Sequence, residues 1–520
     1  MSSFIAYFLL LINLFLFSSC KPDKVNSRIV VASAGKITSL DPAQASTFDV
    51  LQLLSGLGDT LYKFDQNGSL IPRLASELPI FSDLGKTITI PLRKDIYFHD
   101  GTPFNSYAMA FTFRRFMRIG RLNYLIGGRI SSIETPSPYL IRLRLTRASS
   151  SIEGLLTSIN LTPVSPTAYS DHQNKFLNDR FIGTGPYKLT RFNRQQQRLD
   201  PFHLYWGKPA QNKGIDFIKL SNSTALFGAM KSGEIDVLLS NALDEDQHLA
   251  LHKMSLNGNL REGLGRALEI GYITFRSNIE PLSNPIIRTA LSYSLDRKLI
   301  VDRVSYGLRK PLRSLLPPTL KSIEDSPWPS YNPVKAYSLF KSVGYCDDKK
   351  LTIPFTFRSN VPADKLLALT WKEQIDRDLS DCLKLTLQGV ESITVYKQLG
   401  QGAFDAVMLD WRGSYPGIEA YLTPLLSCSK FRDSYCEEGE AAISGSFWSS
   451  FGLEESLQLS DKTVGDQRKE LLNSVERMAA KGGAYLPVWL VTPKAWAQSR
   501  LAVPEFDGSG QLLLERLREH

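Results

Sequence analysis

The chain lacks the common motifs of catalysis. It contains no G-x-S-x-G, no H-E-x-x-H and no G-x-x-x-x-G-K-[ST], so a nucleophile elbow, a zinc-protease helix and a phosphate-binding loop are not expected. Only six histidines occur in 520 residues. His248 and His252 have the four-residue spacing of a metal pair, but they follow an acidic stretch typical of a solvated helix surface. We therefore expect no catalytic residues, no metal site and no cofactor.

The chain also lacks a long run of lysine or arginine. Its 61 basic and 52 acidic residues give a formal charge of +9, and the cations are spread along the sequence. Such diffuse charge is typical of a solvated surface and argues against a nucleic-acid partner. With 43% hydrophobic and 22% charged residues, a chain of this length is expected to bury a large core divided between two or three lobes.

A strongly apolar stretch occurs at the amino terminus, from Phe4 to Phe17, and no later stretch is long enough to span a bilayer. It is shorter than the roughly 20 residues of a membrane span and suits an export signal. Ser18, Ser19 and Cys20 follow in a pattern that resembles a bacterial lipobox, although no Lys or Arg precedes the apolar core. The alternative is a plain secretory signal with an incidental cysteine. We predict a lipoprotein signal peptide over 1–20, lipidation of Cys20 and a soluble, tethered remainder.

Four cysteines follow Cys20, namely Cys346, Cys382, Cys428 and Cys436. An even number in an exported protein permits two disulfides, and four cysteines allow three connectivities. We favour Cys428–Cys436, which closes a short loop, together with Cys346–Cys382. A zinc site is the rival interpretation, but no C-x-x-C spacing occurs.

Strand and helix patterns alternate along the first half of the chain without a repeat. Residues 86–93 and 141–145 alternate apolar and polar side chains, as half-buried strands do. Between these strands, Asn105 can cap a helix that turns Met109 and Phe113 inward. The spacing predicts mixed α and β structure.

Two helix starts in the second half are indicated by a capping asparagine before a proline, at Asn284-Pro285 and Asn332-Pro333. The first helix is expected to run to near Gly307 and the second to Gly344. A helix over 364–381 and strands over 383–387, 404–409 and 485–491 are also expected. Alternation of this kind favours α/β lobes with partly parallel sheets.

An aromatic and glycine-rich segment, Leu409 to Gly417, directly follows a predicted strand. Trp411 and Tyr415 offer apolar area with little entropy to lose, while Gly413 allows a ligand to approach the main chain. These features suit ligand capture at a strand end. The alternative is that both aromatics are core residues around a turn.

Six motifs in order along most of the chain resemble the extracellular solute-binding proteins of bacterial ABC importers for peptides and nickel, family 5. The most specific is Pro91 to Pro103, which closely follows the family's "LRKGVKFHDGTP". The others are Ser39-Leu40-Asp41-Pro42, Ile71-Pro72-Arg73-Leu74-Ala75, Gly183-Thr184-Gly185-Pro186-Tyr187, Lys231 to Asp236, and Ile287-Arg288-Thr289-Ala290 running to Leu295-Asp296-Arg297.

The resemblance implies a periplasmic-binding-protein-like α/β fold, with two hinged lobes that close over a ligand and a smaller lobe inserted in the first. The division expected from it is 21–75, 181–284 and 485–520 for lobe I, 76–180 for inserted lobe II, and 285–484 for lobe III.

In peptide binders of this family the ligand lies extended and pairs its backbone with protein strands. Carried over by position, the resemblance places ligand-binding residues on two segments. These are Lys36, Ile37, Thr38 and Ser39 on lobe I, and Asp410, Trp411, Arg412, Gly413, Ser414 and Tyr415 on lobe III.

The chain departs from the family pattern at the position that pairs with the peptide's free α-ammonium. Peptide binders commonly read "W-x-A-D-Y", whereas Ser414 stands here in place of the aspartate, and Lys36 replaces an acidic residue sometimes found on lobe I. Either Asp410 supplies the missing carboxylate, or the ligand has a blocked or differently placed amine, or added negative charge, as in cell-wall peptides.

The expected function is therefore the substrate-binding component of an ABC transporter, without enzymatic activity, capturing short peptides. Its other expected partners are permease subunits and, through the lipid, a membrane of the bacterial envelope, with the protein a periplasmic monomer. The alternatives are a non-peptide solute (nickel chelate, haem or saccharide) and a receptor-like or structural lipoprotein without a transport role.

Overall fold

The computed structural model describes residues 28–520 except 36, 46, 124–125, 241–242, 321–325, 433–434 and 464. The signal segment and Cys20 therefore lie outside the described residues. Within them, no helix combines the length and apolarity needed to cross a membrane.

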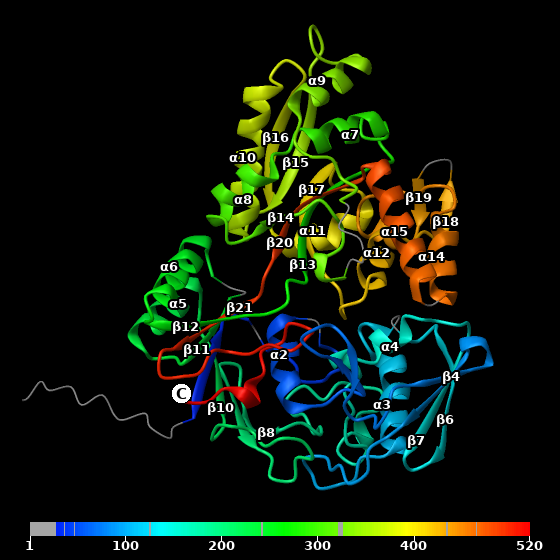
Figure 1. Ribbon diagram of the computed structural model, residues 1–520, viewed down its shortest axis with the longest axis vertical. Coiled ribbons are helices and arrows are strands. Elements are labelled where there is room, and N and C mark those ends of the chain that lie inside the picture. Colours follow the sequence, from blue (N-terminus) through cyan, green and yellow to red (C-terminus); the bar gives the residue numbers. More distant parts are fainter. Residues whose placement is uncertain are drawn as a thin grey trace, which may run out of the picture.

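A seven-stranded sheet forms the base of lobe I, at the lower left of Figure 1. Its central strands are parallel, and the segments that build it come from the beginning, middle and end of the chain. Its order is β12 (Leu260–Leu264), β21 (Lys494–Gln498), β11 (Val237–Leu239), β1 (Ile29–Ser33), β10 (Ile215–Lys219), β9 (Gln196–Pro201) and β8 (Tyr187–Phe192), and its helices include α2 (Phe48–Leu57), α5 (Ser223–Ser232) and α6 (Glu245–Leu256).

A six-stranded sheet forms lobe III, in the upper part of Figure 1. Its order is β14 (Lys310–Pro311), β20 (Tyr485–Val491), β13 (Glu269–Phe275), β17 (Ala406–Arg412), β15 (Leu351–Arg358) and β16 (Leu383–Val390). The helices of this lobe are α7 (Pro285–Tyr293), α8 (Arg297–Ser305), α9 (Pro333–Ser342), α10 (Pro362–Asp378), α11 (Ser392–Gln398), α12 (Glu419–Leu426), α13 (Glu440–Ile443), α14 (Leu453–Lys462) and α15 (Gly465–Gly482).

A four-stranded antiparallel sheet marks lobe II, with the order β4 (Ile80–Ser82), β5 (Thr87–Pro91), β7 (Leu140–Leu145) and β6 (Ile130–Ser137). Helix α3 (Ser106–Ile119) contacts this sheet. As predicted, the side chain of Asn105 caps α3 by accepting from the amide of Ala108, and Met109 and Phe113 are buried. Short helix α4 (Ile152–Leu155) lies beneath α14 of lobe III (Figure 1).

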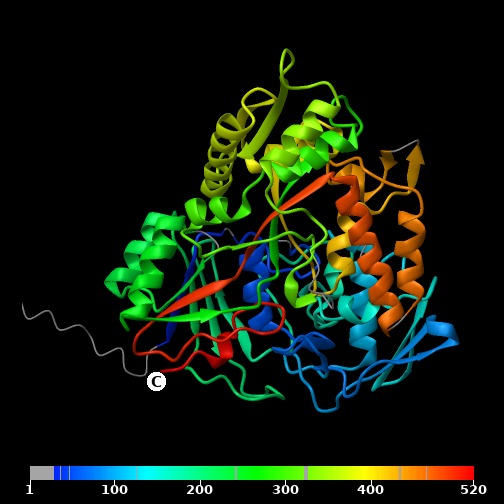
Figure 2. The same cartoon turned by 45° about the horizontal axis from the view of Figure 1, so that its top comes forward.

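The crossings between lobes I and III differ from the sequence-based division at 284/285 and 484/485. Strands β13 and β20 pair with each other inside the lobe III sheet, so the chain crosses at 265–268 and 492–493. The two crossings lie together, since the amide of Gly265 donates to the carbonyl of Pro493 at 2.9 Å (Figure 2). The apolar pattern predicted β20 but not β13, and it carries no information about which sheet a strand joins.

The helix predicted from Pro285 to near Gly307 is two helices. The side chain of Asn284 caps α7 as expected, but α7 ends at Tyr293. Asp296 then caps α8 by accepting from the amide of Leu299. A second capping carboxylate inside one apolar pattern is a local signal that a second helix starts there.

Two disulfides are present, Cys346–Cys382 and Cys428–Cys436, with sequence separations of 36 and 8 residues. These are the pairings that the sequence favoured. Both lie in lobe III.

Candidate functional site

A cavity of about 760 Å³ lies where all three lobes meet. Lobe I contributes Phe48 and Leu51 of α2, lobe II contributes 157–160, and lobe III contributes 410–416. Cavities of about 300–1,000 Å³ hold small ligands in proteins. This cavity therefore has the size and interlobe position of a ligand site.

A second cavity of about 580 Å³ lies between lobes I and III. The two cavities share five of their lining residues, and these five form the wall between them. These wall residues are Phe48, Leu268, Glu269, Asp410 and Arg412.

Within the part of the chain that the structure describes, the edge of β17 that faces β15 is paired for only part of its length. Strand β13 pairs with β17 as far as Arg412, whereas β15 pairs with it only at Ala406 and Val407. The strand therefore presents Met408 to Arg412 without a β15 partner, beside residues that line the cavities. An unpaired strand edge offers main-chain donors and acceptors to an added strand.

Arg412 connects lobe III to lobe I. Its guanidinium donates to the carbonyl of Ser509 in the carboxyl-terminal segment and lies 5.7 Å from the centre of the Phe48 ring. A second connection joins lobes II and III, where the amide of Ser150 donates to the carbonyl of Asp461 at 2.9 Å. The lobes thus contact one another at residues that line the larger cavity, Ser509 and Asp461 among them.

Asp410 already has a cationic partner. Its carboxylate lies 2.7 Å from a guanidinium nitrogen of Arg358, which also pairs with buried Asp364 at 2.7 Å. Burial works against the charge of Arg358, but the two carboxylates outweigh it and raise the pKa of the guanidinium. This pairing argues against the account in which Asp410 receives a ligand ammonium.

Trp411 and Tyr415 are held as parts of the cavity wall. The indole N–H of Trp411 donates to the carbonyl of Ala420 at 2.9 Å, and the hydroxyl of buried Tyr415 donates to Glu419 at 3.0 Å. The Tyr415 ring packs so closely on Gly154 of α4 that a Cβ there would lie 2.4 Å away. The interpretation of both residues as packing aromatics therefore describes most of their contacts, although both line the cavity.

Gly413 and Ser414 have different roles at the same turn. A Cβ on Gly413 would lie 2.8 Å from the carbonyl oxygen of Tyr415, so the glycine is required by the turn itself rather than by an approaching ligand. Ser414 is exposed and lines the larger cavity.

The lobe I segment 36–39, expected to bind the ligand, does not line the cavities where the structure describes it. Lys36 lies outside the described residues. Ile37 packs in the core, Ser39 is buried with its hydroxyl accepting from the amide of Asp41, and Thr38 is exposed, but none of the three lines either cavity. Ala34, Ala45 and Phe48 take that place on the lobe I side.

Glu269 is a residue of the wall that sequence reasoning missed. It begins β13, lies opposite Arg412 in the strand pairing and lines both cavities. Burial and the nearby charge of Asp410 raise the pKa of its carboxyl, against the opposing effect of Arg412. A carboxylate at the start of an otherwise apolar strand was the signal available in the sequence.

The two histidines considered as a metal pair have separate partners. His248 contacts the Ser240 carbonyl through Nε2 at 2.9 Å, and His252 lies 2.7 Å from Glu262. No group of three or more potential metal ligands occurs among the described residues.

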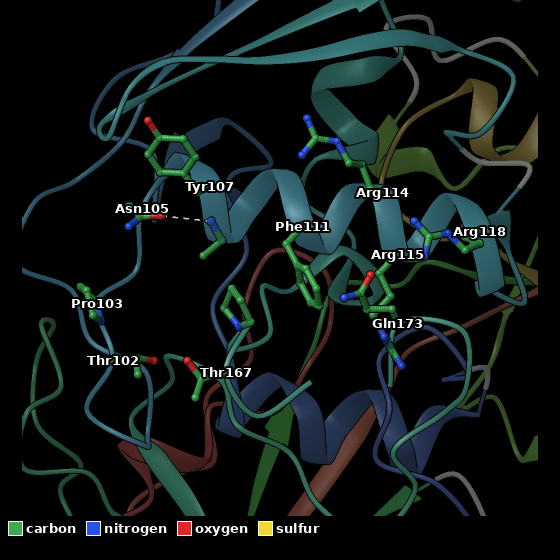
Figure 3. A pocket seen from close by; sticks show the side chains of 12 residues that line it. Thr102, Pro103, Asn105, Tyr107, Phe111, Arg114, Arg115, Arg118, Thr167 and Gln173 are labelled. Atoms are coloured by element: carbon green, nitrogen blue, oxygen red, sulfur yellow. Dashed lines mark hydrogen bonds between the residues drawn. The ribbon is translucent and has the colours of Figure 1, made fainter. Parts of the chain in front are cut away.

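A third cavity of about 600 Å³ belongs to lobe II alone and shares no lining residue with the other two. Tyr107, Phe111 and Arg114 project from α3 at this cavity (Figure 3). Arg115, which also lines it, is directed to a buried ion pair with Asp41. This cavity lies away from the interlobe wall.

The model of the family "Bacterial extracellular solute-binding proteins, family 5 Middle" matches residues 69–433. The glutathione-binding protein GsiB of Shigella flexneri is 26% identical over 351 residues, covering 66% of this chain and 67% of that protein.

Solved structures share the fold. A dipeptide-binding protein from Pseudoalteromonas sp. SM9913, in complex with Met-Leu, has a TM-score of 0.79 at 22% identity and covers 95% of this chain and 100% of that one. NikA from Brucella suis, in complex with Fe(III)-EDTA, has a TM-score of 0.81 at 19% identity with the same coverage. These similarities confirm the α/β periplasmic-binding-protein fold expected from the sequence.

Proposed function

The chain belongs to the bacterial extracellular solute-binding proteins of family 5, and from this membership we propose that it captures short peptides in the larger interlobe cavity for import. It is the solute-binding component of an ABC importer. The observation that carries the peptide assignment is the free edge of β17 beside the cavity. A peptide can add to such an edge through main-chain hydrogen bonds, which give affinity without a fixed sequence.

The volume and the relatives support the same ligand class. About 760 Å³ accommodates a small peptide, and waters can bridge side chains of different sizes to the walls. A glutathione-binding protein and a dipeptide-binding protein are among its relatives. We propose that the protein is not an enzyme and that it delivers its ligand as a monomer to the permease subunits.

The cellular placement is part of the proposal. Export through the segment 1–20 and lipidation of Cys20 would hold the protein at a membrane of the cell envelope, facing the periplasm. Mass spectrometry of the protein from the membrane fraction tests this step, because a Cys20→Ala variant should lose the diacyl mass.

The second candidate is a peptide whose amine is blocked or differently placed, or which carries extra negative charge. Two features favour it: Ser414 stands where an ammonium-binding carboxylate is common in the family, and Asp410 is paired with Arg358.

Native mass spectrometry of the purified protein tests the peptide assignment directly. We expect a ladder of peptide masses, and after unfolding and refolding to remove them, calorimetry should detect binding of peptides of two to five residues. The matched control is the same peptide with its backbone amides N-methylated, which removes donors for strand addition and should abolish binding. A single non-peptide mass, with no peptide binding after refolding, would refute the proposal.

A further inference from the structure

Two opposite charges of the cavity wall lie side by side and are not paired with each other. Glu269 and Arg412 are directly opposite in the antiparallel pairing of β13 and β17. Directly opposite residues have Cβ atoms about 4.5–5.5 Å apart and point to the same face of a sheet. Both side chains line both cavities, so both reach the space that a ligand enters.

The Glu269 carboxylate is open to a cation. Among the described residues it makes no ion pair within 4 Å and no hydrogen bond, while the nearby carboxylate of Asp410 is taken by Arg358. Burial and Asp410 together raise the pKa of Glu269, whereas the charges of Arg412, Arg309 and Arg358 act in the opposite direction without any of them forming an ion pair with it.

Arg412 is similarly open to an anion. One of its N–H groups donates to the carbonyl of Ser509, which leaves the others of the five guanidinium donors for the cavities. A guanidinium binds a carboxylate through two parallel hydrogen bonds when its fork is free. The wall thus presents an acceptor for an ammonium and a donor group for a carboxylate on two adjacent strands.

We propose that Glu269 and Arg412 together bind an α-amino-acid head group, in which an ammonium and a carboxylate are attached to one carbon atom. This inference rests on the proposed peptide-binding function and specifies its ligand class. Such a head group occurs in a peptide whose first residue is linked to the next through its side-chain carboxyl, so that its α-ammonium and α-carboxylate both stay free.

Ordinary α-linked peptides do not present this pattern. Their ammonium and carboxylate are at opposite ends, and each added residue separates them by up to about 3.5 Å. The two end charges of such a peptide therefore cannot meet the two neighbouring side chains as one compact head group does. The ammonium of the side-chain-linked ligand binds at the wall rather than at the turn. This accounts for a serine at position 414, where an ammonium-binding carboxylate is common in the family.

The test compares two isomers of the same composition, γ-Glu-Ala and α-Glu-Ala, by calorimetry on the full protein. We expect the γ isomer to bind at least tenfold more tightly, and Glu269→Gln, which preserves shape, to abolish that preference. Arg412→Met should abolish it as well. Glu470→Gln is the matched control, since Glu470 is exposed on α15 and lines neither interlobe cavity, so its replacement should leave the preference unchanged.

The outcomes separate this inference from the proposed function. Binding of ordinary peptides without a γ preference, or a preference that survives Glu269→Gln in a folded variant, overturns the inference and leaves peptide binding intact. Failure of every peptide to bind the wild-type protein overturns both.

Discussion

The buried ion pair between Asp41 and Arg115 should be the strongest single link between lobes I and II. Asp41 is fully buried and accepts from Arg115 at 2.9 Å, from the amide of Ala43 at 3.0 Å and from the amide of Leu177 at 2.8 Å. Arg115 also donates to the carbonyls of His172 at 2.9 Å and Lys175 at 2.9 Å. The early Ser39 to Pro42 motif is thereby explained as a structural anchor.

Replacement of one partner leaves the other as an uncompensated buried charge. Removing one member of a buried pair costs about 3–5 kcal/mol, and each orphaned buried donor adds about 1–3 kcal/mol. Asp41→Asn turns an amide N–H₂ toward donors, so we expect it to lower the free energy of unfolding by about 4 kcal/mol. In an Arg115→Met background the same change should cost less, because no buried guanidinium is left unpaired.

Urea unfolding followed by circular dichroism measures these differences. The control is Lys298→Ala, which removes an exposed helical ion pair with Asp302 and should cost no more than about 0.5 kcal/mol. If Asp41→Asn is as mild as this control, or if its cost is the same with and without Arg115, the reasoning is refuted.

Two further predictions concern stability. Burial lowers the pKa of His99 from 6.5 to about 4, so the unfolded state binds the proton more readily and stability should fall by up to about 3 kcal/mol as the pH drops from 6.5 to 4. In urea titrations, a His99→Gln variant should lose the fall in unfolding free energy between pH 6.5 and 4 that is due to His99. An unchanged pH profile in this variant would contradict the assignment to His99. Replacing both cysteines of the Cys346–Cys382 disulfide by alanine should cost about 4 kcal/mol, against about 2.5 kcal/mol for Cys428–Cys436, because the longer loop restricts the unfolded chain more. Equal midpoint shifts in urea for the two double variants would count against this loop-length explanation.

Much of the fold could be predicted from local chemistry. The caps at Asn105, Asn284 and Asn332 begin helices where the sequence indicated, because each cap depends on an amide two or three residues away. The strand at 485–491 was predicted with its observed bounds. The restart of the helix at Asp296 was missed, since an apolar period alone does not show that a second cap will be used.

The candidate site was only partly predictable. The segment 410–416 was identified and does line the larger cavity, but the roles of its members were not. Gly413 serves the turn, and Asp410 is paired with Arg358, a residue on another strand. Glu269 was missed because a carboxylate at the start of an apolar strand does not by itself indicate that β13 begins at the cavity.

The sequence by itself determined the family, the α/β class, the main helix starts and the favoured cysteine pairs, because these depend on short motifs and local backbone preferences. Tertiary structure decided which sheet β13 and β20 join, and it placed Glu269 opposite Arg412. Strand partners and cavity walls are chosen by the burial of whole surfaces, a long-range balance that no local pattern encodes.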